Sequence, residues 1–424
     1  MALGFISFLC LSCGQNRTSN SILTGNGSRS AGEGPSTSAL PPKPIQSPLS
    51  SEEFSALKLL IQKNGNDVAL RMKLVDYCLR AGNQPEAAHQ LRTIIHLNPN
   101  HVGALQKLSV LYREANYLDR EFESLRSLVQ LSPDNLESKL RLAEIEMGQF
   151  WLNLAEIQLN KAVAVAPRDP QVFLALASFN FQRHEWSRME TNAREGLKTS
   201  PNSVPLLIAL SDSLRLQNRL PEAEQTLILA ISLTSNPNAL TRRQTQYAHL
   251  LLERGWKSDR SSDAEATAAK ALLNSPDDLE GLYWLARSQE IQGKVAEAVK
   301  NYERAAAQDI QFESVSFFLG HLYQRSSDTK KRKEGQRLLE VFNLAQKNGS
   351  DFSLVVHSLK TKPDDLTSNL NAAQWYSKLG KSPQAILTLR RMLELYPANS
   401  VVKKMLSAQL KSSGRISEAS QIQF

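Results

Sequence analysis

The chain has 424 residues, of which 41% are hydrophobic, 22% charged and 7% aromatic, an ordinary balance for a soluble protein. Its net charge of +8 is spread over fifty basic and forty-two acidic residues without a concentrated basic stripe, which disfavours a nucleic-acid-binding surface. Three cysteines are too few for a disulfide framework.

The N-terminus opens with an apolar run from Ala2 to Leu11 that overlaps the segment Cys10-Leu-Ser-Cys13-Gly14. The run has the length of a signal peptide and is too short for a permanent transmembrane helix. It resembles a bacterial lipoprotein signal, in which a small residue precedes the cysteine that receives the lipid. The resemblance implies a signal segment at residues 1–13, lipidation of Cys13 and an outer-membrane lipoprotein facing the periplasm. The alternative is an unprocessed start and a cytoplasmic protein.

Residues 14–50 are rich in Ser, Gly, Pro, Thr and Asn. Such a segment buries too little apolar surface to offset its ordering entropy, so we expect a disordered linker. From Ser51 the apolar residues recur at helical spacing, beginning with Phe54 and Leu57. We therefore predict a capping helix over residues 51–64.

A proline recurs every 34 residues along much of the remaining chain, at Pro99, Pro133, Pro167 and Pro201, and again from Pro363 to Pro397. A fixed period of this length indicates stacked helical units, each with a helix A, a turn and a helix B. Aligned on this period, residues 65–424 form ten units, which begin at Gly65, Pro99, Pro133, Pro167, Pro201, Asn238, Pro276, Ile310, Pro363 and Pro397.

Two positions of each unit are nearly always small, as close helix packing requires. The first holds Ala, Gly or Ser in all units except the one with Val75. The second is small except at Glu121 and Met189. Its small members are Ala87, Ala155, Ala223, Ala264, Ala298, Gly335, Ala385 and Ala419.

The connections between helices are also periodic. Glycines recur between helix A and helix B, where a left-handed residue would end helix A. These are Gly82, Gly255, Gly293, Gly380 and Gly414. Asn or Asp follows most prolines and is expected to accept hydrogen bonds from the next helix, at Asn100, Asp134, Asp169, Asn202, Asp277 and Asp364.

With small residues at the eighth and twentieth places, glycine near the fifteenth and proline near the thirty-second, residues 65–424 resemble the tetratricopeptide repeat family. Ala87-Ala88 with Leu97-Asn-Pro99 and Ala298-Val299 with Tyr302 are its most typical segments. The resemblance implies an all-α fold, a right-handed superhelical solenoid of about ten helix hairpins.

The period slips in three places. The unit from Pro201 runs long, the next carries an insertion at residues 256–262, and the eighth unit is the most distorted. The eighth unit contains the basic run Lys330 to Lys333 and a tail at residues 352–362. We interpret the basic run as a solvated helix start, the alternative being a contact with anionic lipid or an acidic partner.

No motif for catalysis, cofactor binding or metal binding stands out. The sequence has no nucleophile elbow, P-loop or dinucleotide fingerprint. His89 and His96 lie two helical turns apart, too far to share one metal ion. We therefore expect no enzyme, no cofactor and no metal.

In the family, helix A lines a concave wall that binds partners. The matching positions predict a wall of Arg113, Glu144, Phe181, Arg215, Tyr283, Arg287, Phe317, His321 and Gln374. The four residues Tyr283, Arg287, Phe317 and His321 form the predicted peptide groove, with ordinary packing between repeats as the alternative for the aromatics.

These features predict a non-catalytic scaffold that binds protein or peptide partners. The N-terminus favours a lipid-anchored protein of a bacterial cell envelope that serves assembly, secretion or export. One alternative is a regulatory or accessory subunit of an envelope enzyme complex. The other, for an unprocessed N-terminus, is a cytosolic adaptor.

Overall fold

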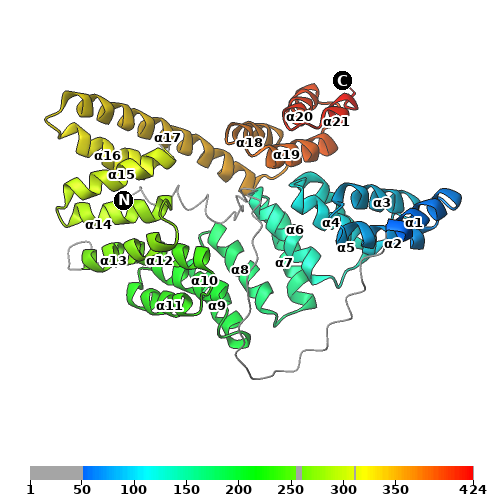
Figure 1. Cartoon of the computed structure of the whole chain (residues 1–424), viewed down its shortest axis with the longest axis horizontal. Helices are drawn as coiled ribbons and strands as arrows, with labels where there is room; N and C mark the ends of the chain where they lie inside the picture. The colour runs from blue at the N-terminus through cyan, green and yellow to red at the C-terminus, as the bar shows by residue number, and fades with distance from the viewer. Residues whose placement is uncertain (1–50, 255–259, 310–311, 424) are drawn as a thin grey trace. The chain divides into compact units, whose positions relative to one another are not determined.

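A computed structural model describes residues 51–254, 260–309 and 312–423. Within these ranges the chain forms twenty-one α-helices and no strand (Figure 1). The chain divides into two compact units, with the boundary between Ala115 and Asn116. We call them unit 1 and unit 2. The expected signal segment 1–13, with Cys13, and the expected linker 14–50 lie outside the described residues.

Unit 1 holds α1 (Ser51–Lys63), α2 (Val68–Arg80), α3 (Gln84–Leu97) and α4 (Val102–Glu114). Unit 2 begins with α5 (Leu118–Leu131), α6 (Leu136–Gly148), α7 (Leu152–Val165), α8 (Pro170–Gln182), α9 (Trp186–Thr199), α10 (Val204–Leu216), α11 (Leu220–Ser232) and α12 (Pro237–Arg254). It continues with α13 (Arg260–Asn274), α14 (Leu279–Ile291), α15 (Val295–Gln308), α16 (Glu313–Gln324), α17 (Thr329–Thr361), α18 (Leu366–Lys378), α19 (Ser382–Leu395), α20 (Ser400–Ser412) and α21 (Ile416–Ser420).

Within each unit, helices that follow one another in the sequence also pack against one another. In unit 1 each helix packs against the next, and the same holds in unit 2 from α5 to α21. Even-numbered helices from α2 onward are the predicted helices A, and odd-numbered helices from α3 onward are the helices B. This arrangement confirms the predicted all-α solenoid of helix hairpins.

The connection into most helices A is a proline turn. At Pro133 the amide of Asn135 donates to the carbonyl of Ser132 (3.0 Å), and the Asn135 side chain then accepts from the amide of Ser138 (2.9 Å). Proline occupies the second place of this four-residue turn, where its fixed φ fits. The capping residue is therefore the second after proline.

The prediction placed most caps one residue too early. Asp169 was placed correctly, because it stands two residues after Pro167. Elsewhere the cap is the following residue: His101, Asn135, Asp278 and Asp365 replace Asn100, Asp134, Asp277 and Asp364, while Ser203 replaces Asn202 without a side-chain cap bond.

In most repeats a left-handed residue separates helix A from helix B. The predicted glycines Gly82, Gly293, Gly380 and Gly414 have φ between 69° and 78°, and Gly255 lies outside the described residues. In four units the same place holds a larger residue with φ of 59° or 60°: Asn116, Phe150, His184 and Asn218. The turn thus keeps its geometry without glycine, at a cost of about 1 kcal/mol per residue.

Small residues form the seam between the helices, as predicted. Ala177, Ala223 and Ala298 are fully buried. At Gly335 of α17 an added Cβ would lie 2.8 Å from the carbonyl oxygen of Gly320 in α16, so only glycine fits. Of the two exceptions, Met189 packs in the core beside Ala177. Buried Glu121 instead accepts two hydrogen bonds from Arg141 of α6, at 2.7 and 2.9 Å.

Unit 1 has its own core, built around Leu74, Leu91 and Ile94. Cys78 is part of this core and fully buried, as expected for a small apolar residue. Helix α1 covers α2, with the Phe54 ring stacked on Tyr77 at 4.7 Å between centroids.

The distorted eighth unit contains one long helix B. Helix α17 runs through residues 329–361 without a break, so the predicted tail at 352–362 is helical up to Thr361. No proline interrupts it, and its two glycines, Gly335 and Gly349, cost only about 1 kcal/mol each. The basic run Lys330 to Lys333 is exposed in its first turn, capped by Asp328, as predicted for a solvated helix start.

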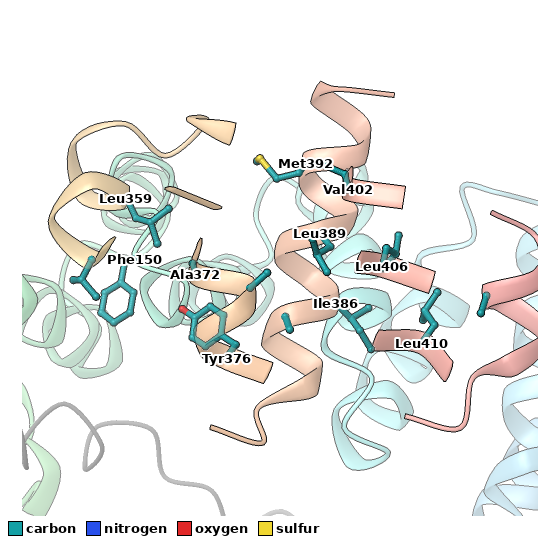
Figure 2. Close-up of a cluster of buried hydrophobic side chains, with 14 residues drawn as sticks. Phe150, Leu359, Ala372, Tyr376, Ile386, Leu389, Met392, Val402, Leu406 and Leu410 are labelled. Atoms are coloured by element: carbon teal, nitrogen blue, oxygen red, sulfur yellow. The ribbon is translucent and has the colours of Figure 1, made fainter. Parts of the chain in front are cut away.

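Unit 2 also contains contacts between segments far apart in sequence, which we call the closing contact. Helix α19 packs against α5, and the turn between α6 and α7 meets α17, α18 and α19. The Phe150 ring lies 6.1 Å from that of Phe352 and joins the buried cluster of Leu359 and Tyr376 (Figure 2). The period of the sequence gave no sign of this contact.

Candidate partner-binding surface

Neighbouring helices A supply the predicted wall. Helix α6 packs against α8, α8 against α10 and α12 against α14, so wall positions of successive repeats lie side by side. The predicted residues are distributed over seven of these helices: Arg113 on α4, Glu144 on α6, Phe181 on α8, Arg215 on α10, Tyr283 and Arg287 on α14, Phe317 and His321 on α16, and Gln374 on α18.

A row of charged and aromatic side chains crosses α10, α12 and α14. The Glu253 carboxylate lies 3.0 Å from Nη1 of Arg215 and 3.3 Å from Nε2 of His249. The imidazole of His249 stacks on Trp284, with ring centroids 4.2 Å apart and planes inclined by 16°. We call Asp212, Arg215, His249, Glu253 and Trp284 the α10–α14 wall.

Burial and pairing shift the pKa values of the two wall carboxylates in opposite directions. Burial alone would raise the pKa of Glu253, but the hydrogen bond and charge of His249 and the charge of Arg215 lower it below its usual value. Burial raises the pKa of Asp212 in spite of the nearby Arg215, Arg243 and His249. The wall therefore presents a preformed set of polar groups beside an aromatic plane.

The structure corrects the orientation of Tyr283. Its ring is buried, within 6.2 Å of Tyr302 and 5.5 Å of Phe312 between centroids, and burial raises its pKa to about 12. Tyr283 therefore follows the alternative given for the aromatic residues, ordinary packing between repeats. The half-buried Trp284 reaches His249 of the neighbouring repeat instead, since one residue along a helix turns the side chain by about 100°.

The other groove residues lie close together. The guanidinium of Arg287 lies 4.0 Å from the centroid of Phe318 and pairs with Glu290 at 2.8 Å. On α16 the Phe317 ring meets His321 edge-on at 4.5 Å, with Phe317 half-buried and His321 exposed. Arg287 and Phe317 both contact Phe318, and the role of Arg287, Phe317 and His321 in binding stays a prediction.

The remaining predicted residues lie on α4, α6, α8 and α18. Arg113 is exposed in unit 1. Glu144 pairs with Arg141 of its own helix at 2.8 Å, and Phe181 packs on Trp186 at 5.7 Å between centroids. Gln374 is exposed on α18. The sequence analysis did not predict three residues of the α10–α14 wall: Trp284, Asp212 and Glu253. Trp284 could have been found, because a tryptophan directly follows the predicted Tyr283.

The described residues contain neither a metal-ligand cluster nor a membrane-spanning helix. Among them, no group of three or more His, Cys, Asp or Glu side chains is placed to hold a metal ion. In the same ranges no helix combines the length and the apolar character needed to span a bilayer.

Two family models, both described as tetratricopeptide repeat, match the chain at residues 256–311 and 368–399. The chain therefore contains tetratricopeptide repeats in these two segments. Proteins of this family are typically non-catalytic scaffolds for protein interactions, and this protein shares their repeat architecture. No curated protein sequence gives a significant match.

Solved structures similar to this chain come from several organisms. A tetratricopeptide repeat protein from Parabacteroides merdae is 13% identical, with 69% of this chain and 99% of that chain covered and a TM-score of 0.47. The pilF protein of Pseudomonas aeruginosa is 16% identical, with 56% and 97% covered and a TM-score of 0.43. Yeast Tom70 is 16% identical, with 71% and 60% covered and a TM-score of 0.43.

Proposed function

We propose that this protein is a non-catalytic scaffold that holds a protein or peptide partner on the α10–α14 wall. We further propose that Cys13 carries a lipid that anchors it in a bacterial cell envelope, where it serves assembly, secretion or export. The scaffold acts by preformed contacts, without a chemical step.

The observation that supports the binding proposal is the row from Arg215 through Glu253 and His249 to Trp284. Tryptophan and arginine are enriched among the residues that contribute most to binding. The side chains here are already fixed by pairing and stacking, so a partner orders few groups on binding.

The wall is tested by comparing two variants of the full chain in quantitative capture of partners from host extracts. His249→Ala removes the stacking partner of Trp284, and we expect the specifically captured partner to fall about tenfold. Leu273→Ala is the control, since Leu273 is 82% exposed on α13, away from the row. Circular dichroism verifies that both variants keep their helix content.

Equal capture by His249→Ala and the unsubstituted chain would remove the wall from consideration. If both variants lose the partner, the loss is not specific to the wall, and binding would be assigned to another surface.

The anchor is tested separately by incorporation of a labelled fatty acid in a bacterial host. A stable anchor needs lipid attachment, because the apolar start at residues 2–11 is too short to span the membrane. We expect label on the unsubstituted chain and none on Cys13→Ala. An unlabelled wild-type chain would contradict the anchor and leave the cytosolic adaptor.

A further inference from the structure

The closing contact has an ionic half, formed by α5 with α19 and the start of α21. Asp119 accepts two hydrogen bonds from Arg415, at 2.9 and 2.8 Å, and lies 2.6 Å from Nε of Arg390. Glu418 pairs with Arg390 at 2.6 Å, with Arg415 at 2.7 Å and with Arg120. Two carboxylates and three guanidiniums thus share one contact.

The Asp119–Arg415 pair at the centre of this contact is buried but remains charged, whereas Arg390, Arg120 and Glu418 are partly exposed. The side chain of Asp119 is 1% exposed and that of Arg415 is 6% exposed. Burial would raise the pKa of Asp119, but the hydrogen bonds from Arg415 and the charges of Arg415, Arg390 and Arg120 lower it. A buried ionic contact of this kind adds little net stability, because separated charges regain their hydration.

The helices that face α5 across the ionic half, α19 to α21, have a core of their own. Ile386, Leu389, Val402, Leu406 and Leu410 join α19 and α20 in one buried cluster (Figure 2). Its members from α19 to α21 do not depend on α5 for burial partners. The last helices can therefore leave α5 without losing the packing among themselves.

The ionic half closes one circuit of helix contacts in unit 2, beside the contacts that the turn between α6 and α7 makes with α17, α18 and α19. Each helix from α5 to α21 packs on the next, and α19 returns to α5. We propose that the ionic half is a reversible latch, by which α19–α21 release from α5 and convert the closed circuit of repeats into an open one. Opening exposes an acidic site at Asp119 on one side and the guanidiniums of Arg390 and Arg415 on the other.

The latch is tested by measuring the distance between spin labels on the full chain. Gln130 of α5 and Ser412 of α20 are exposed and suit cysteine substitution. Cys10 and Cys13 are replaced by serine, while Cys78 is buried and stays unlabelled. At low salt we expect one short distance, as the closed circuit requires.

Two perturbations should open the latch. Asp119→Asn removes the charge that three guanidiniums share, and we expect the population at longer distance to rise at least about tenfold. Sodium chloride at about 1 M, where the Debye length is about 3 Å, should act in the same direction on the unsubstituted chain. Glu195→Gln is the control, because it breaks an exposed pair with Lys198 on α9 and should leave the distance unchanged.

An unchanged distance in Asp119→Asn with intact helix content would overturn the latch, as would a long distance already dominant at low salt. If Asp119→Asn fails to fold, Arg390→Gln and the salt titration replace it. Arg390→Gln leaves the Asp119–Arg415 pair in place, and absence of opening in both experiments would overturn the proposal. None of these outcomes depends on the α10–α14 wall.

Discussion

The stacked repeats α8–α16 and the closing contact hold unit 2 together in different ways. Between stacked helices the seam consists of fully buried alanines such as Ala177, Ala223 and Ala298. The closing contact joins segments almost 300 residues apart, with Asp119 and Arg415 separated by 296 positions, and it relies on charges and on the large ring of Phe150. The seam between repeats depends on small side chains that recur in most repeats. The closing contact occurs once and depends on particular charged side chains and on one aromatic ring.

The largest effect is expected where a stacked seam is filled. Gly335→Ala places a Cβ 2.8 Å from the Gly320 carbonyl oxygen and 3.0 Å from the Gln324 amide nitrogen, and backbone atoms cannot move away as a side chain can. We expect the free energy of unfolding to fall by about 3 kcal/mol in chemical denaturation. Gly148→Ala is the matched control, because its Cβ would meet nothing within 4 Å. Equal stability of the two variants would contradict the tight seam between α16 and α17.

A smaller, pH-dependent effect is expected in the closing contact. Burial raises the pKa of Glu146 to about 8, against the lowering charges of Arg391, Lys161 and Arg126. Because the folded pKa lies above the unfolded one, this stability contribution is fully present below about pH 4.5 and is lost as pH rises through about 8.

Glu146→Gln removes this titration. We expect the variant to exceed the unsubstituted chain in stability by on the order of 2 kcal/mol at pH 9 and to match it near pH 5, measured by thermal unfolding across pH. Parallel pH profiles for the two chains would show that Glu146 is not buried as described.

The smallest effect is expected at a turn of the stack. Asn218 has φ of 60° where other repeats have glycine. Asn218→Gly should raise the free energy of unfolding by at most about 0.5 kcal/mol, because relief of the left-handed backbone is offset by added freedom of the unfolded chain. Thermal unfolding measures the difference, and a clear loss of stability would mean that the Asn side chain itself holds the turn.

The sequence predicted those parts of the fold that repeat. Helix order, small seam residues and left-handed turns recur at one period, so each repeat supports the interpretation of the others. The caps were misplaced by one residue at Asn100 and Asp134, because the proline turn uses the residue after proline within the turn. The closing contact could not be predicted, since it occurs once and joins distant segments.

The site was predicted less well than the fold. The family pattern selected helices A, and the structure pairs Arg215 of α10 with Glu253 of α12 and brings Phe317 and His321 of α16 together. It chose Tyr283 over Trp284 because a position in a repeat pattern does not fix helix rotation, and the next residue points about 100° away. Pairing partners such as Glu253 are visible only once α10 and α12 lie side by side.

The central claim, that the α10–α14 wall holds a partner, is tested most directly by site-specific photo-crosslinking in the native host. A photoreactive amino acid replaces Trp284 in one chain and the exposed Leu273 in another. We predict a discrete adduct with one partner from position 284 and none from position 273. No adduct from position 284, or the same adduct from both positions, would contradict the wall as the binding surface.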